Sequence, residues 1–345
     1  MIISKTPFRI SFFGGGTDYP EHFTQHGGAV LGTAIDKFAY LAATPLYSRL
    51  FDYRIRLAYR EVECVNDIDE IRHAPFRECL RSTGVTSDVE VDYTAELPSS
   101  TGLGTSSSFV VGALNTLYAF QGRTIHPLEL AYRAIEIERD MLGESVGCQD
   151  QTFAAMGGFN LIEFRTTRDI VVHRVPLSTA RHREFESHLL AVFTGIRRRA
   201  SHVASKQISK IGQNTSRLKQ MRRLVDKGYD TLANGGSLAQ FGSLLHEGWV
   251  LKNSLCDSVS NDQINATYRQ GLEAGALGGK LLGAGGGGFI LFFVPPERRE
   301  SVTTALGHLE TIPIQVNAQG TQIIHTSKAV ETESGNRRTL VVRAA

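Results

Sequence analysis

The chain has 345 residues, a length that suits two domains better than a single core. Its formal net charge is +2 with no strongly basic or acidic tail, which argues against nucleic acid as the main partner. The four cysteines are scattered without a Cys-x-x-Cys pair, and no apolar run is long enough for a signal peptide or a membrane span. We therefore expect reduced thiols, no disulfide scaffold or zinc site, no membrane partner and a cytoplasmic protein.

The first half of the chain is rich in predicted strands and carries two predicted helices. Alternating or continuous apolar residues predict strands at 8–13, 39–46 and 88–97. A helix should begin after the polar loop 97–108 and end near Gly122, and a second should cover 127–142.

The second half alternates helices and strands. Apolar periodicity predicts helices at 215–233, 237–253, 262–276 and 297–310, and a buried strand at 289–294. The change of texture near 175–185 predicts two domains, residues 1–180 and 181–345.

The loop "LPSSTGLGTSSS", residues 97–108, joins a predicted strand to an apolar helix. A helix N-terminus offers unpaired N–H groups and partial positive charge, and the glycines let the backbone approach a ligand closely. These features are typical of a phosphate cradle, and one of the hydroxyls could face a metal ion. A flexible surface loop with a serine N-cap is the alternative, although a linker would not need so apolar a continuation.

Two common phosphate motifs do not fit the chain. A Walker A loop would need a hydroxyl where Leu281 stands and a glycine where Ala274 stands. A dinucleotide fingerprint would need glycine at Ser107, which argues against a nucleotide-sugar oxidoreductase.

Two further glycine-bearing segments and one acidic segment are candidates for the same site. "TPFRISFFGGGTDYP" (6–20) could present Arg9 to an anion and Asp18 to sugar hydroxyls, and "GGKLLGAGGGGFILFF" (278–293) indicates close backbone approach. "IEIERDMLGESVGCQDQ" (135–151) supplies Glu138 and Asp150. Phosphoryl transfer needs positioning, a metal, positive charge and a proton acceptor, and Ser106, Glu138, Arg9 and Asp150 could fill those roles.

Taken in order, "PFRISFFGGGTD", "PSSTGLGTSSS" and "KLLGAGGGGF" resemble the three motifs of the GHMP kinases, the family of galactokinase, homoserine kinase, mevalonate kinase and phosphomevalonate kinase. The resemblance implies an α+β, two-domain fold. Its N-terminal domain would be like the second domain of ribosomal protein S5, its C-terminal domain would be ferredoxin-like, and the active site would lie between them. It also implies an ATP-dependent phosphotransferase that uses Mg2+.

The resemblance assigns roles to individual residues. Asp150 would orient or deprotonate the acceptor hydroxyl beside Arg9, and Ser106 and Glu138 would hold magnesium. ATP would be bound by Pro98, Ser99, Ser100, Gly102, Leu103, Gly104, Thr105, Ser106 and Ser107. The substrate would be bound by Gly15, Gly16, Thr17, Asp18, Arg198, Gly285 and Gly286.

The first motif, residues 7–18, bears on the substrate because it lacks two residues that galactokinases carry there. Galactokinases carry Gly-Glu-His-Thr-Asp where this chain has Gly14–Asp18 without the glutamate and histidine, which argues against galactose. The segment "FTGIRRRASHVASKQ" (193–207) resembles kinases that phosphorylate the anomeric hydroxyl of D-glycero-D-manno-heptose 7-phosphate. That reaction gives the 1,7-bisphosphate, in the synthesis of nucleotide-activated heptose for surface polysaccharide. Arg197–Arg199, with Arg198 foremost, could clamp the distal phosphate, or could be a solvated helix start.

Two alternatives remain open at this point. One is a kinase of a free sugar such as L-fucose or another hexose, because a glycine-rich motif one also suits fucokinase-like domains. The other is a sensor that binds ATP and sugar without catalysis, which the presence of all four chemical residues disfavours. No pattern indicates the oligomeric state, the anomer or the adenine pocket.

Overall fold

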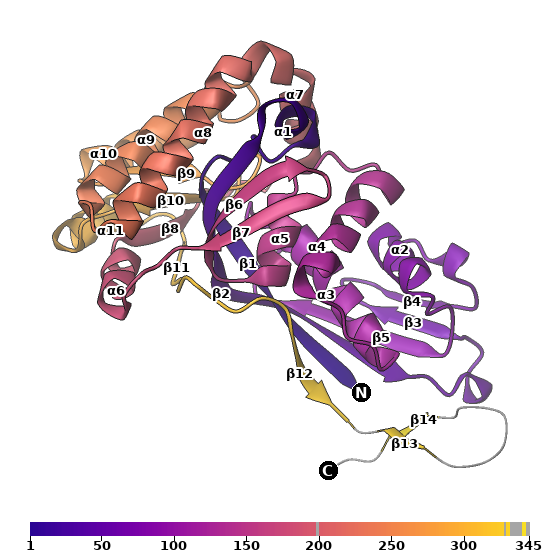
Figure 1. Cartoon of the computed structure of the whole chain (residues 1–345). Coiled ribbons are helices and arrows are strands. Elements are labelled where there is room, and N and C mark those ends of the chain that lie inside the picture. The colour runs from indigo at the N-terminus through magenta and orange to yellow at the C-terminus, as the bar shows by residue number, and fades with distance from the viewer. Residues whose placement is uncertain (198–199, 328, 332–339, 343–345) are drawn as a thin grey trace.

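The computed structural model describes residues 1–197, 200–327, 329–331 and 340–342. The described residues form two larger sheets with helices packed against them and one two-stranded sheet, which confirms the α+β class (Figure 1). Within these residues no helix is long and apolar enough to cross a membrane. All four cysteines are free, as expected.

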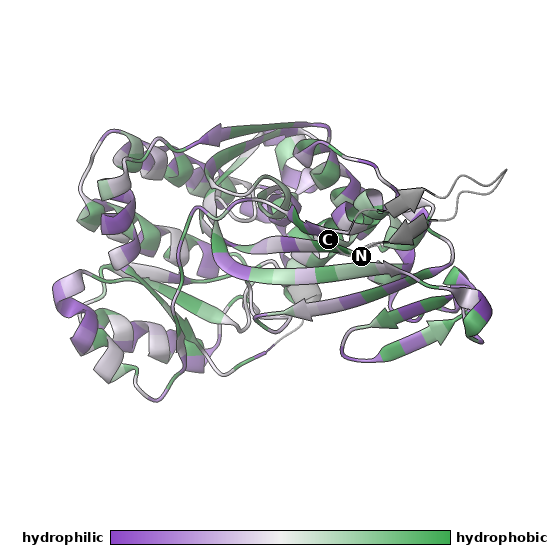
Figure 2. Ribbon diagram, turned by 90° about the horizontal axis from the view of Figure 1, so that it is seen from below, coloured by the Kyte–Doolittle hydropathy of each residue, from purple (hydrophilic) through white to green (hydrophobic). Residues whose placement is uncertain are grey.

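The first sheet has eight strands in the order β12-β1-β2-β5-β3-β4, with β6 paired to β2 and β7 paired to β6. All pairs are antiparallel except β3 with β5. The strands are β1 Ile2–Phe13, β2 Gly28–Pro45, β3 Ile55–Ala58, β4 Val62–Val65, β5 Val89–Ala95, β6 Phe159–Thr166, β7 Asp169–Arg174 and β12 Gln322–Thr326. Buried residues alternate with half-buried ones along β3 and at the start of β5, and hydrophobic and hydrophilic bands alternate along strands in Figure 2.

The helices of this half lie in two places. α1 (Pro20–His26) follows β1 directly, whereas α2–α5 gather beside the sheet (Figure 1). The latter are α2 Ala74–Thr83, α3 Thr105–Phe120, α4 Pro127–Glu136 and α5 Gln149–Met156. The helix expected at 127–142 changes to a π-helical turn, Ile137–Met141, after α4. The helix α2 lies in a strand-rich part of the prediction, in a stretch to which no element was assigned.

The second sheet has four antiparallel strands in the order β11-β8-β10-β9. They are β8 Leu189–Phe193, β9 Gly278–Leu281, β10 Phe289–Phe293 and β11 Thr311–Ile312. Helices separate β8 from β9 and β10 from β11, which is the β-α-β-β-α-β arrangement of ferredoxin-like domains.

The helices of the second half are α6 Thr179–Ser187, α7 Ala200–Ser209, α8 Ile211–Ala233, α9 Leu238–Asn253, α10 Asp262–Glu273 and α11 Arg299–Ala305. The predicted helices at 215–233, 237–253 and 262–276 are therefore present, the first with an earlier start. The helix predicted at 297–310 is shorter, because a 3-10 turn at Pro296–Arg298 precedes it and the chain leaves it after Ala305. A two-stranded pair, β13 (Ala329–Glu331) and β14 (Leu340–Val342), follows β12.

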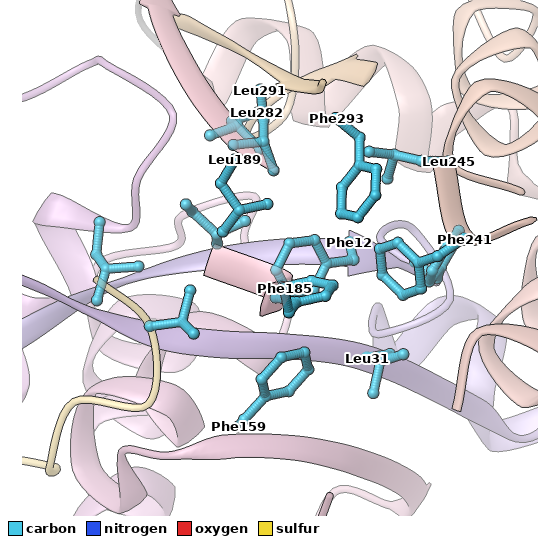
Figure 3. Close-up of a cluster of buried hydrophobic side chains, with 14 of the residues drawn as sticks. Phe12, Leu31, Phe159, Phe185, Leu189, Phe241, Leu245, Leu282, Leu291 and Phe293 are labelled. Carbon is cyan, nitrogen blue, oxygen red and sulfur yellow. The ribbon is translucent and has the colours of Figure 1, made fainter. Parts of the chain in front are cut away.

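One hydrophobic cluster joins the two halves (Figure 3). Phe12 of β1 packs edge-on against Phe185 of α6 with ring centroids 5.4 Å apart, and Phe185 packs edge-on against Phe241 of α9 at 5.1 Å. Phe293 of β10 lies in the same cluster. The chain also returns to the first sheet at its end, where β12 pairs with β1. The boundary at 180 stays a prediction, and residues 322–326 pair with the N-terminal sheet.

Candidate active site

A cavity of about 280 Å³ is lined by residues from both halves of the chain. Its wall contains the end of β1, the loop before α3, the segment before α5, and parts of α7, α9 and the turn after β9. The three glycine-bearing segments of the sequence therefore meet at one place. Of the residues predicted for the site, those lining the cavity are Arg9, Gly15, Gly16, Asp18, Ser99, Ser100, Gly102, Gly104, Thr105, Ser106, Ser107 and Asp150.

The loop before α3 presents a helix N-terminus to the cavity. Gly104 is the N-cap residue with a φ of 76°, a backbone conformation that a side chain would strain, and α3 begins at Thr105. A Cβ at Gly104 would stand 3.2 Å from Arg9 Cγ and 3.4 Å from Asp150 Oδ2. Pro98 and Leu103 do not line the cavity: the Pro98 carbonyl accepts from Thr101 Oγ1, and the Leu103 side chain is buried in the core.

Arg9 and Asp150 form a bidentate ion pair at the cavity wall. Arg9 Nε donates to Asp150 Oδ1 at 2.8 Å, and Arg9 NH2 donates to Oδ2 at 2.6 Å. The remaining terminal nitrogen, NH1, donates to the Gly102 carbonyl at 2.7 Å, and this contact ties the arginine to the loop. The Arg9 side chain is only 6% exposed, whereas that of Asp150 is 24% exposed, so the carboxylate is the partner that a ligand can reach.

Asp18 lies deeper in the same wall. Its Oδ1 accepts from the Gly16 N–H at 2.9 Å, and burial raises the pKa of its carboxyl above the usual range. A Cβ at Gly147 would fall 1.9 Å from Asp18 Oδ2, so only glycine fits there. Thr17 is fully buried and does not line the cavity: its hydroxyl donates to the Gly14 and Ala29 carbonyls and shapes the glycine turn.

The third glycine segment supports the loop more than it lines the cavity. A Cβ at Gly102 would lie 2.6 Å from the Leu282 carbonyl oxygen, and one at Gly283 would lie 2.5 Å from Gly102 Cα, so the two backbones cross in contact. Gly283 lines the cavity, but Gly285 and Gly286 do not. Those two pack against Val259, whose carbonyl accepts from the Gly286 N–H at 2.8 Å.

Glu138 lies behind the loop, on the π-helical turn, and is fully buried. Its carboxylate accepts from Ser107 Oγ at 3.0 and 2.9 Å and from the Gln151 side-chain amide. Both partners are neutral, and burial raises the pKa of Glu138 to about 8. Ser106, the neighbouring hydroxyl, is exposed and lines the cavity. Among the described residues no group of three or more His, Cys, Asp or Glu side chains is placed to hold a metal.

Two buried lysines were not predicted. Lys252 of α9 lines the cavity, and its Nζ donates to the carbonyls of Leu281 at 2.9 Å and Gly283 at 2.5 Å. Lys280 of β9 donates to the carbonyls of Ser11 at 2.7 Å and Phe12 at 2.8 Å, and so ties the second sheet to β1. Burial lowers the pKa of both, that of Lys252 to about 7.

No local pattern marked these lysines, because a lysine on an amphipathic helix or beside a glycine run is usually solvated. Glu144 and Gln207 also line the cavity and were not predicted. Arg198 lies outside the described residues.

Comparison with known proteins decides the family. The model of the GHMP kinases N terminal domain matches residues 72–158, and the model of the GHMP kinases C terminal matches residues 224–309. The chain belongs to the GHMP kinases. The resemblance inferred from the three motifs is thereby confirmed, together with the two-domain fold that it implied.

The relatives of this GHMP kinase include kinases of sugars as well as mevalonate kinases. The D-glycero-alpha-D-manno-heptose 7-phosphate kinase of Campylobacter jejuni is 30% identical over 82% of this chain and 86% of its own. The L-fucokinase/L-fucose-1-P guanylyltransferase of Bacteroides fragilis is 26% identical over 83% of this chain, but this match covers only 34% of that protein.

Solved structures show the same fold. A D-glycero-D-manno-heptose 1-phosphate kinase from Bacteriodes thetaiotaomicron superimposes with a TM-score of 0.78, at 25% identity, over 94% of this chain and 100% of that one. Lactococcus lactis galactokinase superimposes with a TM-score of 0.73 at 17% identity, over 94% of this chain and 95% of that one. This protein is therefore an ATP-dependent kinase with a sugar as the acceptor.

Proposed function

We propose that this kinase transfers the terminal phosphoryl group of Mg-ATP to the anomeric hydroxyl of D-glycero-D-manno-heptose 7-phosphate and forms the 1,7-bisphosphate. The observation that carries the chemistry is the Arg9–Asp150 pair, which faces the cavity beside the N-terminus of α3. The choice of sugar is supported by the 30% identity to a heptose 7-phosphate kinase.

The acceptor side of the reaction follows from the carboxylates. Asp150 is partly exposed to the cavity, so its free lone pairs can accept the proton of the attacking hydroxyl. Arg9 holds the carboxylate in one orientation through two hydrogen bonds and cannot itself lose a proton. Asp18, fixed by backbone N–H groups, would accept a second sugar hydroxyl and orient the ring.

The donor side follows from the loop and α3. The first residues of α3, Thr105–Ser107, line the cavity, and the positive end of the helix dipole would favour the ATP phosphates. The φ values of Gly102 and Gly104, 83° and 76°, let the loop approach them without a side chain in between.

Magnesium fits the residues present on chemical grounds. Glu138 is a fully buried carboxylate with neutral partners only, so a cation would relieve its desolvation. Mg²⁺ commonly takes one or two carboxylates together with substrate phosphates and waters, which agrees with a site of one acid and the Ser106 hydroxyl. When bound, the ion would neutralise charge on the phosphate oxygens.

The phosphate already carried by the sugar needs its own partner. The cluster Arg197–Arg199 precedes α7, and α7 lines the cavity through Ala204 and Gln207. We infer from this position that Arg198 would bind the distal phosphate, a geometry that a guanidinium suits.

The test is an ATP-consumption assay with magnesium over a sugar panel: D-glycero-D-manno-heptose 7-phosphate, sedoheptulose 7-phosphate, mannose 6-phosphate, galactose, L-fucose and mevalonate. Strong turnover on the heptose phosphate alone is expected. Turnover on L-fucose would instead favour the activity named in the Bacteroides fragilis relative, and ATP binding without turnover on any sugar would favour a sensor.

Two variants test whether Arg198 binds the distal phosphate of the sugar. Arg198→Ala should raise KM for the heptose phosphate by roughly 10-fold or more, because a charged hydrogen bond is lost. Arg183→Ala, an exposed arginine on α6, is the matched control. The clamp is wrong if Arg198→Ala raises KM equally for a phosphorylated and an unphosphorylated sugar.

A further inference from the structure

Lys252 is a buried cation in the cavity wall to which the chemistry above gives no role. Its side chain comes from α9 and is 5% exposed. Two of its three N–H bonds are used by the Leu281 and Gly283 carbonyls, at 2.9 and 2.5 Å. Within residues 1–197 and 200–327 no acceptor is bonded to the third N–H bond.

Neither buried lysine beside the cavity contacts a carboxylate within the described residues. Arg9 is matched by Asp150 in a bidentate pair, but neither Lys252 nor Lys280 forms an ion pair there. Asp18 and Glu144 also line the cavity, and the oxygens of Asp18 accept from backbone N–H groups. A buried ammonium without a contacting counter-ion is costly, so a phosphate oxygen within reach of Lys252 Nζ would offset that cost.

The backbone crossing of the two glycine segments brings Lys252 to the reacting end of the cavity. The Gly102 carbonyl accepts from Arg9 NH1, and the Gly283 carbonyl accepts from Lys252 Nζ. The backbones of the two glycines are in contact. The pKa of Lys252 is lowered to about 7, first by burial and then by the charge of Arg9. A phosphate group between the two cations would favour the charged ammonium.

We propose that Lys252 is a phosphate-binding residue of the active site, which donates its free N–H to a phosphate oxygen in the cavity. The inference rests on the proposed function. Two groups carry this chemistry: the phosphoryl group that leaves ATP, and the phosphate that the sugar already bears. The competing explanation is that Lys252 only ties the turn after β9 to α9.

Two variants distinguish phosphate binding by Lys252 from a purely structural role of its carbonyl contacts. Lys252→Met removes the charge and both carbonyl contacts, whereas Lys252→Gln removes the charge but keeps an amide that can donate to the same carbonyls. Lys227→Met, at an exposed position on α8, is the control. Urea unfolding of each variant shows whether it is folded, and Lys252→Gln serves alone if Lys252→Met does not fold.

The measurements are three dissociation constants by calorimetry: Mg-ATP alone, heptose 7-phosphate alone, and Mg-ADP with aluminium fluoride in the presence of the sugar. Aluminium fluoride in the last complex mimics the phosphoryl group in the transition state of transfer. We expect Lys252→Gln to weaken at least one of the last two by roughly 10- to 100-fold, because a hydrogen bond between charged groups is lost.

The ligand affected identifies the phosphate. Weakening confined to the aluminium fluoride complex assigns Lys252 to the transferred phosphoryl group, and weakening of the sugar phosphate alone assigns it to the sugar's own phosphate. The proposal is overturned if Lys252→Gln is folded and leaves both constants within about 2-fold of the control. Failure of the wild-type enzyme to phosphorylate any sugar phosphate would instead overturn the proposed function, independently of the variants.

Discussion

Replacement of Glu138 by glutamine should make the protein more stable and less able to use magnesium. The side chain is fully buried, and burial raises its pKa to about 8 from an ordinary value of 4.5. Between these two pH values the folded protein retains a proton that the unfolded chain releases. Stability is therefore lost as pH rises through this window, until the carboxyl ionises in the folded state as well.

The size of the effect follows from the pKa shift. One pKa unit corresponds to about 1.4 kcal/mol, so the carboxyl should cost the folded state roughly 3 kcal/mol at pH 7 and less than about 1 kcal/mol at pH 5. Glutamine does not ionise in this pH range and has nearly the same shape as the glutamic acid side chain. Its amide can donate to Ser107 Oγ while its oxygen accepts from Gln151, so the variant keeps a hydrogen bond to each of the two residues that contact the carboxylate.

The assay is urea unfolding of wild type and Glu138→Gln at pH 5 and pH 7, without divalent ions and then with Mg-ATP. Without ligand the variant should be more stable by roughly 3 kcal/mol at pH 7, and the two proteins should converge at pH 5. Mg-ATP should stabilise the wild type more than the variant. A variant that is no more stable at pH 7, or a stability difference that does not change with pH, would refute the reasoning.

Three further substitutions test the rest of the site. Asp150→Asn should lower kcat by roughly 100- to 10,000-fold with little change in Mg-ATP affinity, since the proton acceptor is lost; near-normal turnover would show that no carboxylate is needed. Gly147→Ala should raise the sugar KM by roughly 10-fold or more, because its Cβ would fall 1.9 Å from Asp18 Oδ2, and an unchanged KM would remove Asp18 from sugar binding. Ser106→Ala should shift the magnesium dependence of activity to higher concentration, and an unchanged titration would place that hydroxyl outside the metal's ligands.

Local sequence patterns were sufficient to predict the secondary-structure elements nearest the site. The strand at 8–13, the polar loop and the apolar helix after it were all predicted, because alternation, glycines and an apolar run act within a few residues of each other. The π-helical turn at Ile137–Met141 had no such signal, since its extra residue changes the helix without changing its composition. The helix α2 was missed although a signal was present: Phe76, Cys79, Leu80 and Thr83 follow a helical period, and Gly84 ends the helix.

The sequence by itself indicated the family through its motifs, the α+β class through that resemblance, and the presence of Arg9, Asp18 and Asp150 in candidate segments, because motifs are local properties of the chain. Tertiary structure decided which candidates reach the cavity. It buried Glu138 behind Ser107 and packed Gly285 and Gly286 against Val259. It also brought Lys252 into the wall from a helix more than a hundred residues after the loop. Burial and pairing depend on contacts between distant segments, so they are settled only when the two sheets pack around their shared core.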